Sequence, residues 1–356
     1  MGSIIPLKIN FVMMKHYLIS LLLFACIFVP GRAHELPRVF VFTDINIDSG
    51  DPDDRQSLVH LFWYANEAAI EGIVPDRWNA RGLEACLMAL EAYRRDFAEF
   101  SFQELGYPEP DTLKKRIARD TLDAFRLFLA AASKKDAPLY VLVWGNMELF
   151  KTFLLQRPEL MKNIRLITIG TGLMLEKDFP YIPNDWPRTI PCKQLNWNGF
   201  GRNQIYDNPE FDELWWLEIN WTYAGMFTGK KPARMLKKLS VYGNLGRHMK
   251  EVVKNESWAQ YFRAGDTPSL LYVIDRGHDK NNPCQSSWAG KFVKPFPEKK
   301  PNYYTDDAGK VSWDYANPCN TWKNHEKVRN HAVKTLEKRR NNMYSALLGK
   351  LNQIYR

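Results

Sequence analysis

The chain has 356 residues, of which 45% are apolar and 13% aromatic, so it can build the core of one large domain or two small ones. This composition excludes a mainly disordered protein, and a single long apolar run excludes a membrane protein with several spans. The net charge is +9, but residues 321–356 alone hold nine Lys or Arg against two Glu. A nucleic-acid binder distributes basic charge over a recognition face, so nucleic acid is not expected as a partner.

The N-terminal segment has the features of a secretory signal. Lys15 precedes a 13-residue apolar run, residues 17–29, and the small residues Gly31 and Ala33 follow it. The run is shorter than the about 20 residues that a membrane-spanning helix needs. We therefore expect residues 1–33 to be a signal peptide and the mature protein to be secreted or periplasmic. A lipoprotein anchored at Cys26 is the alternative.

Short apolar runs then alternate with helical patterns. Residues 38–42, 70–74, 139–143 and 164–169 have the composition of buried strands. The order strand–helix–strand–helix predicts an α/β fold, in which a mostly parallel central sheet is covered by helices on both faces. We expect one domain over residues 34–320. One helix is predicted to begin at Asp53. Further helices are predicted over residues 81–97, 121–133, 147–156, 209–221 and 266–274.

The C-terminal part of the chain divides into loops and one helix. Residues 277–320 are rich in Pro, Asn and Gly and are expected to be loops. Residues 321–356 are expected to form a basic helix that packs on the domain or extends from it. A solvated face is the simpler interpretation of its charge, and contact with an anionic surface is the alternative.

Four cysteines remain after the signal segment, and none has the CxxC spacing of a zinc or thioredoxin-like site. Cys284 and Cys319 each follow Asn-Pro, and they are the pair expected to form a disulfide, because export permits disulfides. Cys86 lies on the apolar face of a predicted helix and is expected to be a buried hydrophobic residue.

An acidic loop follows the first predicted strand. Ligands of open parallel sheets bind beyond the carboxyl ends of the strands, where this loop begins. Its carboxylates repel one another unless a cation or a proton intervenes, and such an oxygen-rich set favours Ca²⁺ ahead of Mg²⁺. A solvated acidic turn that caps the following helix is the alternative. The loop holds five aspartates within eleven positions: Asp44, Asp48, Asp51, Asp53 and Asp54.

Five motifs of the chain resemble those of the nucleoside hydrolases, and they occur in the same order. Thr43-Asp44 followed by Asp53-Asp54 is similar to the aspartate-rich N-terminal motif of that family. The closer resemblance is to a branch of secreted bacterial nucleoside-hydrolase-like proteins whose substrate is poorly defined, and it covers about residues 38–292. The other four similar segments are residues 72–79, 143–146, 196–210 and 265–270.

The resemblance implies a calcium ion bound by Asp44, Asp54, the main-chain carbonyl of Trp144 and Asp266. It also implies that Asp44 takes the proton from an attacking water molecule. Metal-bound water is a stronger acid than bulk water, so a nearby carboxylate can complete its deprotonation.

The same resemblance implies a binding site for a pentose beside the cation. Asp53 would accept hydrogen bonds from sugar hydroxyl groups, and Asn79, Asn196 and Asn198 would surround the ring. The remaining carboxylates would face the positive charge that develops on the sugar in an oxocarbenium-like transition state.

Two features depart from the family pattern. Residues 45–52 make the spacing between Asp44 and Asp53 longer than usual, so Asp48 could replace Asp44 as ligand or base. Gly265 occupies the position at which many nucleosidases have a His that protonates the leaving base. The acid for the leaving group is therefore unassigned, and His248 and Arg247 are candidates by residue type only.

These observations predict a secreted, calcium-dependent hydrolase of a glycosidic bond to a pentofuranose-like sugar, N-linked as in nucleosides or O-linked in a glycan. Many of the 12 Trp lie in the loop-rich part, where they can stack on sugars or pack as anchors. One alternative is a glycan-binding protein without activity, and another is an envelope protein that docks through its basic C-terminal helix. The sequence leaves the sugar and the oligomeric state open, a homo-oligomer included.

Overall fold

The computed structural model describes residues 1–2, 35–47, 52–171, 201–255, 257, 260–316 and 325–356. The chain divides into two units, Met1–Leu36 and Pro37–Arg356, and all the helices and strands named below belong to the second. Apart from residues 1–2, the predicted signal peptide lies outside the described residues. Within the described part, no helix is both long and apolar enough to cross a membrane.

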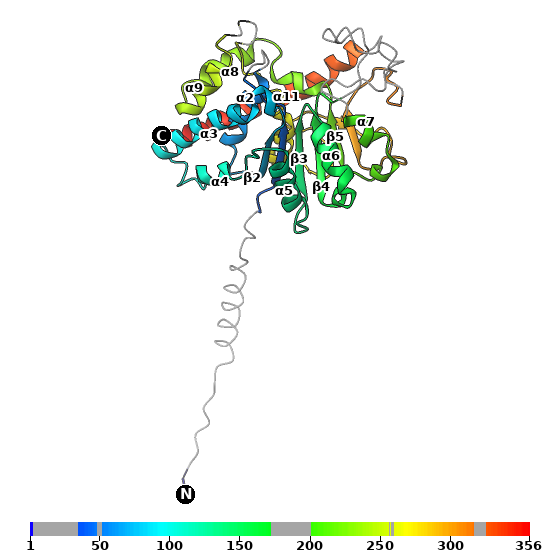
Figure 1. Ribbon diagram of the computed structural model, residues 1–356, viewed down its shortest axis with the longest axis horizontal. Helices are drawn as coiled ribbons and strands as arrows, with labels where there is room; N and C mark the ends of the chain where they lie inside the picture. Colours follow the sequence, from blue (N-terminus) through cyan, green and yellow to red (C-terminus); the bar gives the residue numbers. More distant parts are fainter. Residues whose placement is uncertain (3–34, 48–51, 172–200, 256, 258–259, 317–324) are drawn as a thin grey trace. The chain divides into compact units, whose positions relative to one another are not determined.

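A single sheet of seven strands organises the described part of the second unit, in the order β2-β1-β3-β4-β5-β7-β6 (Figure 1). Neighbouring strands are parallel except for β6 and β7. The predicted α/β fold with a mostly parallel sheet is therefore confirmed. The strands are β1 (Arg38–Thr43), β2 (Ala69–Pro75), β3 (Leu139–Trp144), β4 (Ile164–Ile169), β5 (Trp216–Ile219), β6 (Phe292–Val293) and β7 (Tyr303–Asp306).

Successive side chains of each strand point to opposite faces of the sheet, and both faces are apolar. In β1, Val39 and Val41 belong to one buried cluster, whereas Phe40 and Phe42 belong to the other. Helices α2, α3, α9, α10 and α11 supply the first cluster, and α5 and α6 supply the second (Figure 1). Burial on both faces explains why the strands read as unbroken apolar runs rather than as alternating patterns.

The helices agree with most of the predicted ones. The longer ones are α2 (Asp53–Trp63), α3 (Gly82–Glu99), α5 (Thr121–Ala132), α6 (Glu148–Gln156), α8 (Lys231–Leu239), α9 (Gly243–Glu251), α10 (Pro268–Ile274) and α11 (His325–Ile354). The shorter ones are η1 (Trp78–Ala80), α4 (Pro110–Lys114), η2 (Pro158–Asn163), α7 (Gly201–Tyr206), η5 (Pro209–Phe211) and η6 (Thr222–Met226).

The predicted helix at residues 209–221 is wrong. The segment contains the short η5 and then β5, whose four residues are all buried between β4 and β7. A short apolar run such as Leu214–Leu217 fits helix and strand equally well, and here the neighbouring strands decide. The expectation of loops alone over residues 277–320 is also wrong, because this part contains β6 and β7.

Neither edge of the sheet presents a long strand with all its main-chain groups free, as far as the described residues show. Beyond β2, the main chain after α4 runs beside the strand, and the Ile73 N–H donates to the carbonyl of Arg116 at 2.8 Å. The Ala118 N–H in turn donates to the carbonyl of Ile73 at 2.9 Å. At the other edge lies β6, which has two residues and pairs antiparallel with β7.

The basic C-terminal helix is a core element. Leu336, Met343 and Leu347 of α11 are fully buried in the first cluster. Arg340 is also buried, and its guanidinium donates to the carbonyls of Gly225 and Thr228 at 2.5 and 2.8 Å. Other basic side chains of α11, namely Lys327, Arg329, Lys334 and Lys338, are exposed, so they occupy the outer side of a helix whose inner side completes the core.

The predicted state of Cys86 is confirmed, since it is fully buried in α3. Cys284 is half-buried, and its expected partner Cys319 lies outside the described residues.

Candidate metal and sugar site

Three carboxylates from two distant segments converge beyond the carboxyl end of β1. Asp53 and Asp54 lie in the first turn of α2, and Asp266 lies shortly before α10. One carboxylate oxygen from each lies within 4.8 Å of the other two. Oxygen ligands of one Ca²⁺ lie 2.3–2.6 Å from the ion, so two of them can be at most about 5 Å apart. The three carboxylates therefore fit a single calcium ion.

Polar residues of α2 hold the Asp266 loop in place. The Ser57 hydroxyl donates to Oδ2 of Asp266 at 3.2 Å and accepts from the Asp266 N–H at 3.3 Å. One turn further on, Nδ1 of His60 lies 3.1 Å from the Thr267 hydroxyl. Gln56 accepts from the Arg263 N–H at 2.6 Å. These contacts fix Asp266 against the helix that carries the other two carboxylates.

Burial and the repulsion between neighbouring carboxylates raise the pKa of Asp54. Burial is the largest cause that raises its pKa well above the usual value, and the charges of Asp266, Asp44 and Asp53 add to it. The Thr43 hydroxyl, at the end of β1, donates to Oδ1 of Asp54 and opposes this rise in part. Without a cation, the cluster therefore holds a proton more tightly than an ordinary carboxylate does.

Asp44 and Trp144 end neighbouring strands beside this cluster. The Asp44 N–H donates to the Trp144 carbonyl over 3.5 Å, and the Trp144 indole donates to Ser269 at 2.9 Å. Ser269 in turn donates to the carbonyl of Asp266 at 2.6 Å. The Asp44 carboxylate is not one of the three converging groups, and it lies 3.4 Å from Nη2 of Arg77. Asp44 is thus at the rim of the cluster, close enough to affect Asp54 electrostatically.

Asp76 was not singled out in the sequence, although it has the same position after β2 that Asp44 has after β1. Its N–H donates to the carbonyl of Thr43 at 3.0 Å, so it lies at the same edge of the sheet. Both carboxylate oxygens are buried and have no hydrogen-bond partner in the described part of the chain. Burial and then the charge of Asp44 raise its pKa well above the usual value, although Arg77 opposes this. The Pro75-Asp76 pair, directly after a buried strand, was the available signal.

Of the four predicted sugar contacts, Asp53 and Asn79 are described, and Asp53 is part of the carboxylate cluster. Asn79 is exposed in η1, which follows β2 and contacts the start of the acidic loop, because the Ile47 N–H donates to the carbonyl of Ala80 at 3.4 Å. Asn196 and Asn198 lie outside the described residues, as does the alternative ligand Asp48.

An arginine and three aromatic rings border the cluster on the side of Asp53. Nε of Arg263 lies 3.8 Å from Oδ2 of Asp53, and its guanidinium is 4.6 Å from the centre of the Phe227 ring. Tyr261 and Tyr223 are neighbours of Phe227, and all three rings are half-buried. Aromatic faces of this kind suit the C–H faces of a sugar. Their position beside Asp53 could not be predicted, because they lie far from Asp53 along the chain.

The other candidates from the sequence are not part of this arrangement. A Cβ atom on Gly265 would lie 2.8 Å from Oδ2 of Asp53, so the position of the missing histidine is filled by the cluster itself. His248 and Arg247 line a different groove, between α3 and α9, with Leu87 and Met88. Burial, with the charge of Arg55, lowers the pKa of His248 to about 4, so it is neutral at pH 7.

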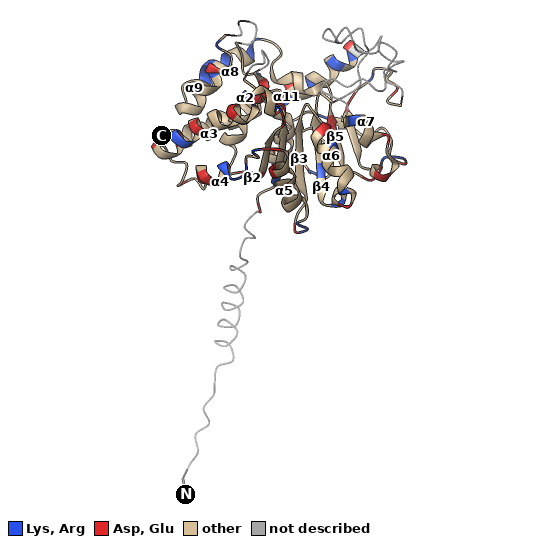
Figure 2. Ribbon diagram, in the orientation of Figure 1, with Lys and Arg blue, Asp and Glu red and all other residues tan. Residues whose placement is uncertain are grey.

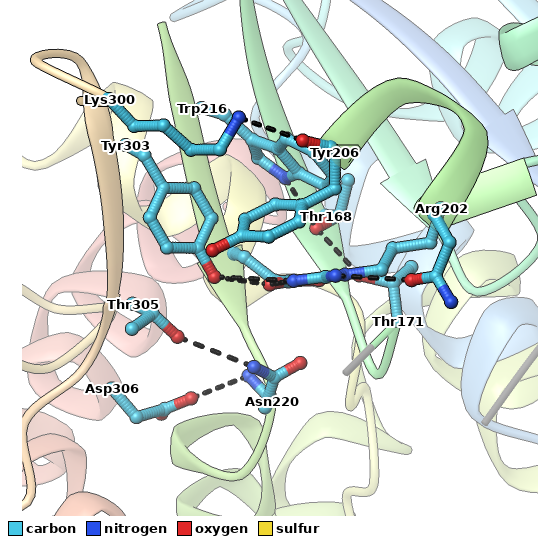
Figure 3. A network of polar contacts seen from close by, with 12 residues as sticks. Thr168, Thr171, Arg202, Tyr206, Trp216, Asn220, Lys300, Tyr303, Thr305 and Asp306 are labelled. Atoms are coloured by element: carbon cyan, nitrogen blue, oxygen red, sulfur yellow. Dashed lines mark hydrogen bonds and ion pairs between the residues drawn. The ribbon is translucent and has the colours of Figure 1, made fainter. Parts of the chain in front are cut away.

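A second polar cluster lies at β5, and its members Thr171, Arg202 and Tyr303 are labelled in Figure 3. Its central residue is Glu218 of β5. Nε and Nη2 of Arg202 donate to its two oxygens at 2.8 and 2.7 Å. Tyr303 and Thr171 donate to the same carboxylate at 2.5 and 3.0 Å. Burial works against the charge of Glu218, but these donors, Arg202 foremost, hold its pKa below the usual value. Every charge in this cluster is paired, so it joins α7 to the sheet and is not a free binding site.

Comparisons with known proteins agree with this architecture. Residues 38–292 match the family described as "Cellulose-binding Sde182, nucleoside hydrolase-like domain". A nucleoside hydrolase-related hypothetical protein from Saccharophagus degradans, associated with carbohydrate metabolism, is similar in structure with a TM-score of 0.58 and 15% identity. The alignment covers 90% of this chain and 72% of that one.

A more distant similarity is found to an inosine-uridine preferring nucleoside hydrolase from Bacillus anthracis. Its TM-score is 0.44 at 12% identity, over 84% of this chain and 100% of that one. No curated protein matches the chain in sequence.

Proposed function

The chain belongs to the cellulose-binding Sde182 family of nucleoside hydrolase-like domains, and from this premise we propose that it is an exported, calcium-dependent hydrolase. The bond cleaved is a glycosidic bond to a pentofuranose-like sugar, N-linked or O-linked. The observation that carries the proposal is the convergence of Asp53 and Asp54 with Asp266, which lies more than 200 positions further along the chain. The predicted signal segment supports export.

In this proposal, Asp54, Asp266 and the Trp144 carbonyl hold the cation, with Asp44 at the rim. A bound calcium ion would lower the pKa of a coordinated water molecule and orient the sugar hydroxyls. Asp44 accepts the proton of the attacking water, since its side chain is 20% exposed and can meet solvent. Its ion pair with Arg77 holds the carboxylate at the rim of the cluster.

Asp53 and the aromatic residues bind the sugar. Asp53 is partly exposed and accepts hydrogen bonds from vicinal hydroxyl groups, while Asn79 approaches from η1. The Phe227 and Tyr261 rings provide an apolar surface for one face of the sugar. The remaining negative charge of the cluster stabilises the positive charge on the ring in the transition state.

The test is hydrolysis of nucleosides and of aryl arabinofuranosides and ribofuranosides, measured with EDTA and after calcium is restored. We expect release of the sugar only with calcium, and loss of about 10³-fold or more in rate in Asp54→Asn, because one ligand and one stabilising charge are removed. Asp111→Asn is the matched control, since that carboxylate is 73% exposed and its ion pair is with Arg94, which is not part of the cluster. Equal rates with EDTA and with calcium would contradict the proposal.

A glycan-binding protein without hydrolytic activity is the second candidate. It is favoured by the absence of a histidine at Gly265 and by the family's description as cellulose-binding. In that case, calcium-dependent binding of a sugar is measurable by calorimetry, no sugar is released, and Asp44→Asn leaves the affinity unchanged. Under the leading proposal, the same variant binds the sugar but does not hydrolyse it.

A further inference from the structure

A basic cavity lies on the edge of the sheet beyond β2 and shares no residue with the acidic cluster. It is lined by α4, the segment that follows it, and α5, and it has a volume of about 770 Å³. Binding sites for small ligands usually have volumes of about 300–1,000 Å³, so this cavity is large enough for a short oligosaccharide. Its charged lining consists of Lys114, Lys115, Arg116, Arg119, Arg126 and Asp123.

Five cationic side chains thus face one carboxylate, and that carboxylate is already paired. Asp123 accepts hydrogen bonds from Nε of Arg119 at 3.2 Å and from Nη2 of Arg126 at 2.7 Å. Its side chain is 9% exposed, whereas those of the two arginines are 77% and 65% exposed. The arginines therefore hold Asp123 with one edge and present the rest of each guanidinium to solvent.

The other three cations, Lys114, Lys115 and Arg116, make no ion pair within 4.0 Å among the residues that the structure describes. Their main chain is fixed, because the Arg116 carbonyl accepts from Ile73 of β2 and Leu113 and Ile117 are buried beside it. Like charges that are held together on a rigid segment repel one another, so an anionic ligand that enters between them is stabilised.

We propose that the basic cavity binds an acidic polysaccharide through its carboxylate or sulfate groups. Guanidinium groups match both anions with paired hydrogen bonds, and lysines add point charges at the rim. The cavity is hollow and bounded by two helices, which suits a short stretch of a single chain rather than the broad basic face that a nucleic acid needs. Figure 2 shows Lys and Arg on many elements, so this set is distinguished by its cavity and not by charge alone.

Binding of three probes to the purified protein tests the proposal: polygalacturonate, dextran sulfate and neutral dextran. The buffer contains EDTA, so that calcium cannot bridge polygalacturonate to the acidic cluster. We expect both anionic polymers to bind, with an affinity that falls as salt rises, and dextran not to bind. The stronger of the two anionic polymers identifies carboxylate or sulfate as the preferred group.

The variant Lys114→Gln/Lys115→Gln/Arg116→Gln should weaken this binding about tenfold, because three unpaired cations are lost. Arg119 and Arg126 are left unchanged, since their removal would leave the buried carboxylate of Asp123 without its ion pairs. The matched control is Arg234→Gln/Lys237→Gln/Lys238→Gln on α8, where three exposed basic residues give the same change in charge. Wild-type affinity is expected in this control.

Three results would overturn the proposal: no binding of either anionic polymer, equal weakening in both triple variants, or tighter binding of duplex DNA or anionic vesicles through the same three residues. Because Asp54→Asn should leave polygalacturonate binding unchanged, this experiment can fail while the hydrolytic proposal stands, and the reverse also holds.

Discussion

At the scale of single residues, the acidic cluster depends on side chains that never touch a ligand. Ser57 contacts both the N–H and the carboxylate of Asp266, and Thr43 donates to Asp54. Such supporting contacts orient a ligand and limit its motion, so their loss commonly weakens metal binding by about 10- to 100-fold.

Ser57→Ala should therefore weaken calcium binding by about tenfold or more, while the protein remains folded. The Asp266 carboxylate would lose the hydrogen bond that the Ser57 hydroxyl donates to it. Calcium affinity by titration calorimetry, with the thermal midpoint measured in parallel, checks this prediction. Ser240→Ala, which removes a hydroxyl whose hydrogen bond among the described residues is to the Lys237 carbonyl, should behave as wild type.

The sequence allowed part of this site to be predicted. Asp54 and Asp266 were expected to share a cation, and their carboxylates do converge. The roles of Gln56 and Ser57 could not be predicted, since each depends on which remote segment packs against it. Gln56, for example, contacts residues about 200 positions away, and no local pattern encodes such a contact.

At the scale of helices and strands, long apolar patterns were predicted well and short ones were not. β1 contains the uninterrupted apolar run of residues 39–42 and β3 is apolar throughout, whereas β5 is interrupted by Glu218, which argues against a central strand when it is read alone. The buried Arg202 beside it, with Tyr303 and Thr171 as further donors, makes a charged residue acceptable there. A strand of this kind is determined by its partners and is not visible in its own four residues.

Arg202→Met should destabilise the fold by about 3–5 kcal/mol, because it leaves the Glu218 carboxylate buried and unpaired. Adding Glu218→Gln should recover part of this loss, since no uncompensated charge then remains. Urea denaturation of the single and double variants gives both values. In comparison, Arg94→Met breaks an exposed ion pair with Asp111 and should cost only about 0–1 kcal/mol.

Helix α11 was predicted, but its contribution to the core was left open. Leu336 is fully buried against η6, and a Cβ atom on Gly225 would lie 3.0 Å from it. Leu336→Ala should lower the free energy of unfolding by about 2–5 kcal/mol through the cavity it creates. The exposed Leu122 provides the control, because Leu122→Ala should change stability by less than about 0.5 kcal/mol. A near-neutral Leu336→Ala would instead indicate that the helix is an appendage.

At the scale of the whole molecule, the raised pKa of Asp54 connects stability to pH and to calcium. Between its usual pKa and the raised value, the metal-free folded state binds more protons than the unfolded state does. The stability of the metal-free protein should therefore fall as the pH rises through this interval. Calcium competes with the proton, so its stabilising effect should grow with pH over the same range.

Thermal midpoints measured from pH 4.5 to pH 8, with EDTA and with calcium, test this dependence. In Asp54→Asn the metal-free midpoint should change less with pH, because the titrating group is gone, and calcium should add little. A calcium effect that is the same at every pH would show that no proton leaves the cluster when the ion binds.

The two edges of the sheet have a consequence for how copies of this protein can meet. An open strand offers a row of free N–H and carbonyl groups onto which another chain can add. In the described part of the molecule, Ile73 of β2 is already bonded to residues 116 and 118, and the opposite edge is only as long as the two residues of β6. Among the described residues, neither edge therefore offers a long uninterrupted row of free groups. We expect contacts between folded copies to use helical surfaces rather than the addition of strands at these edges.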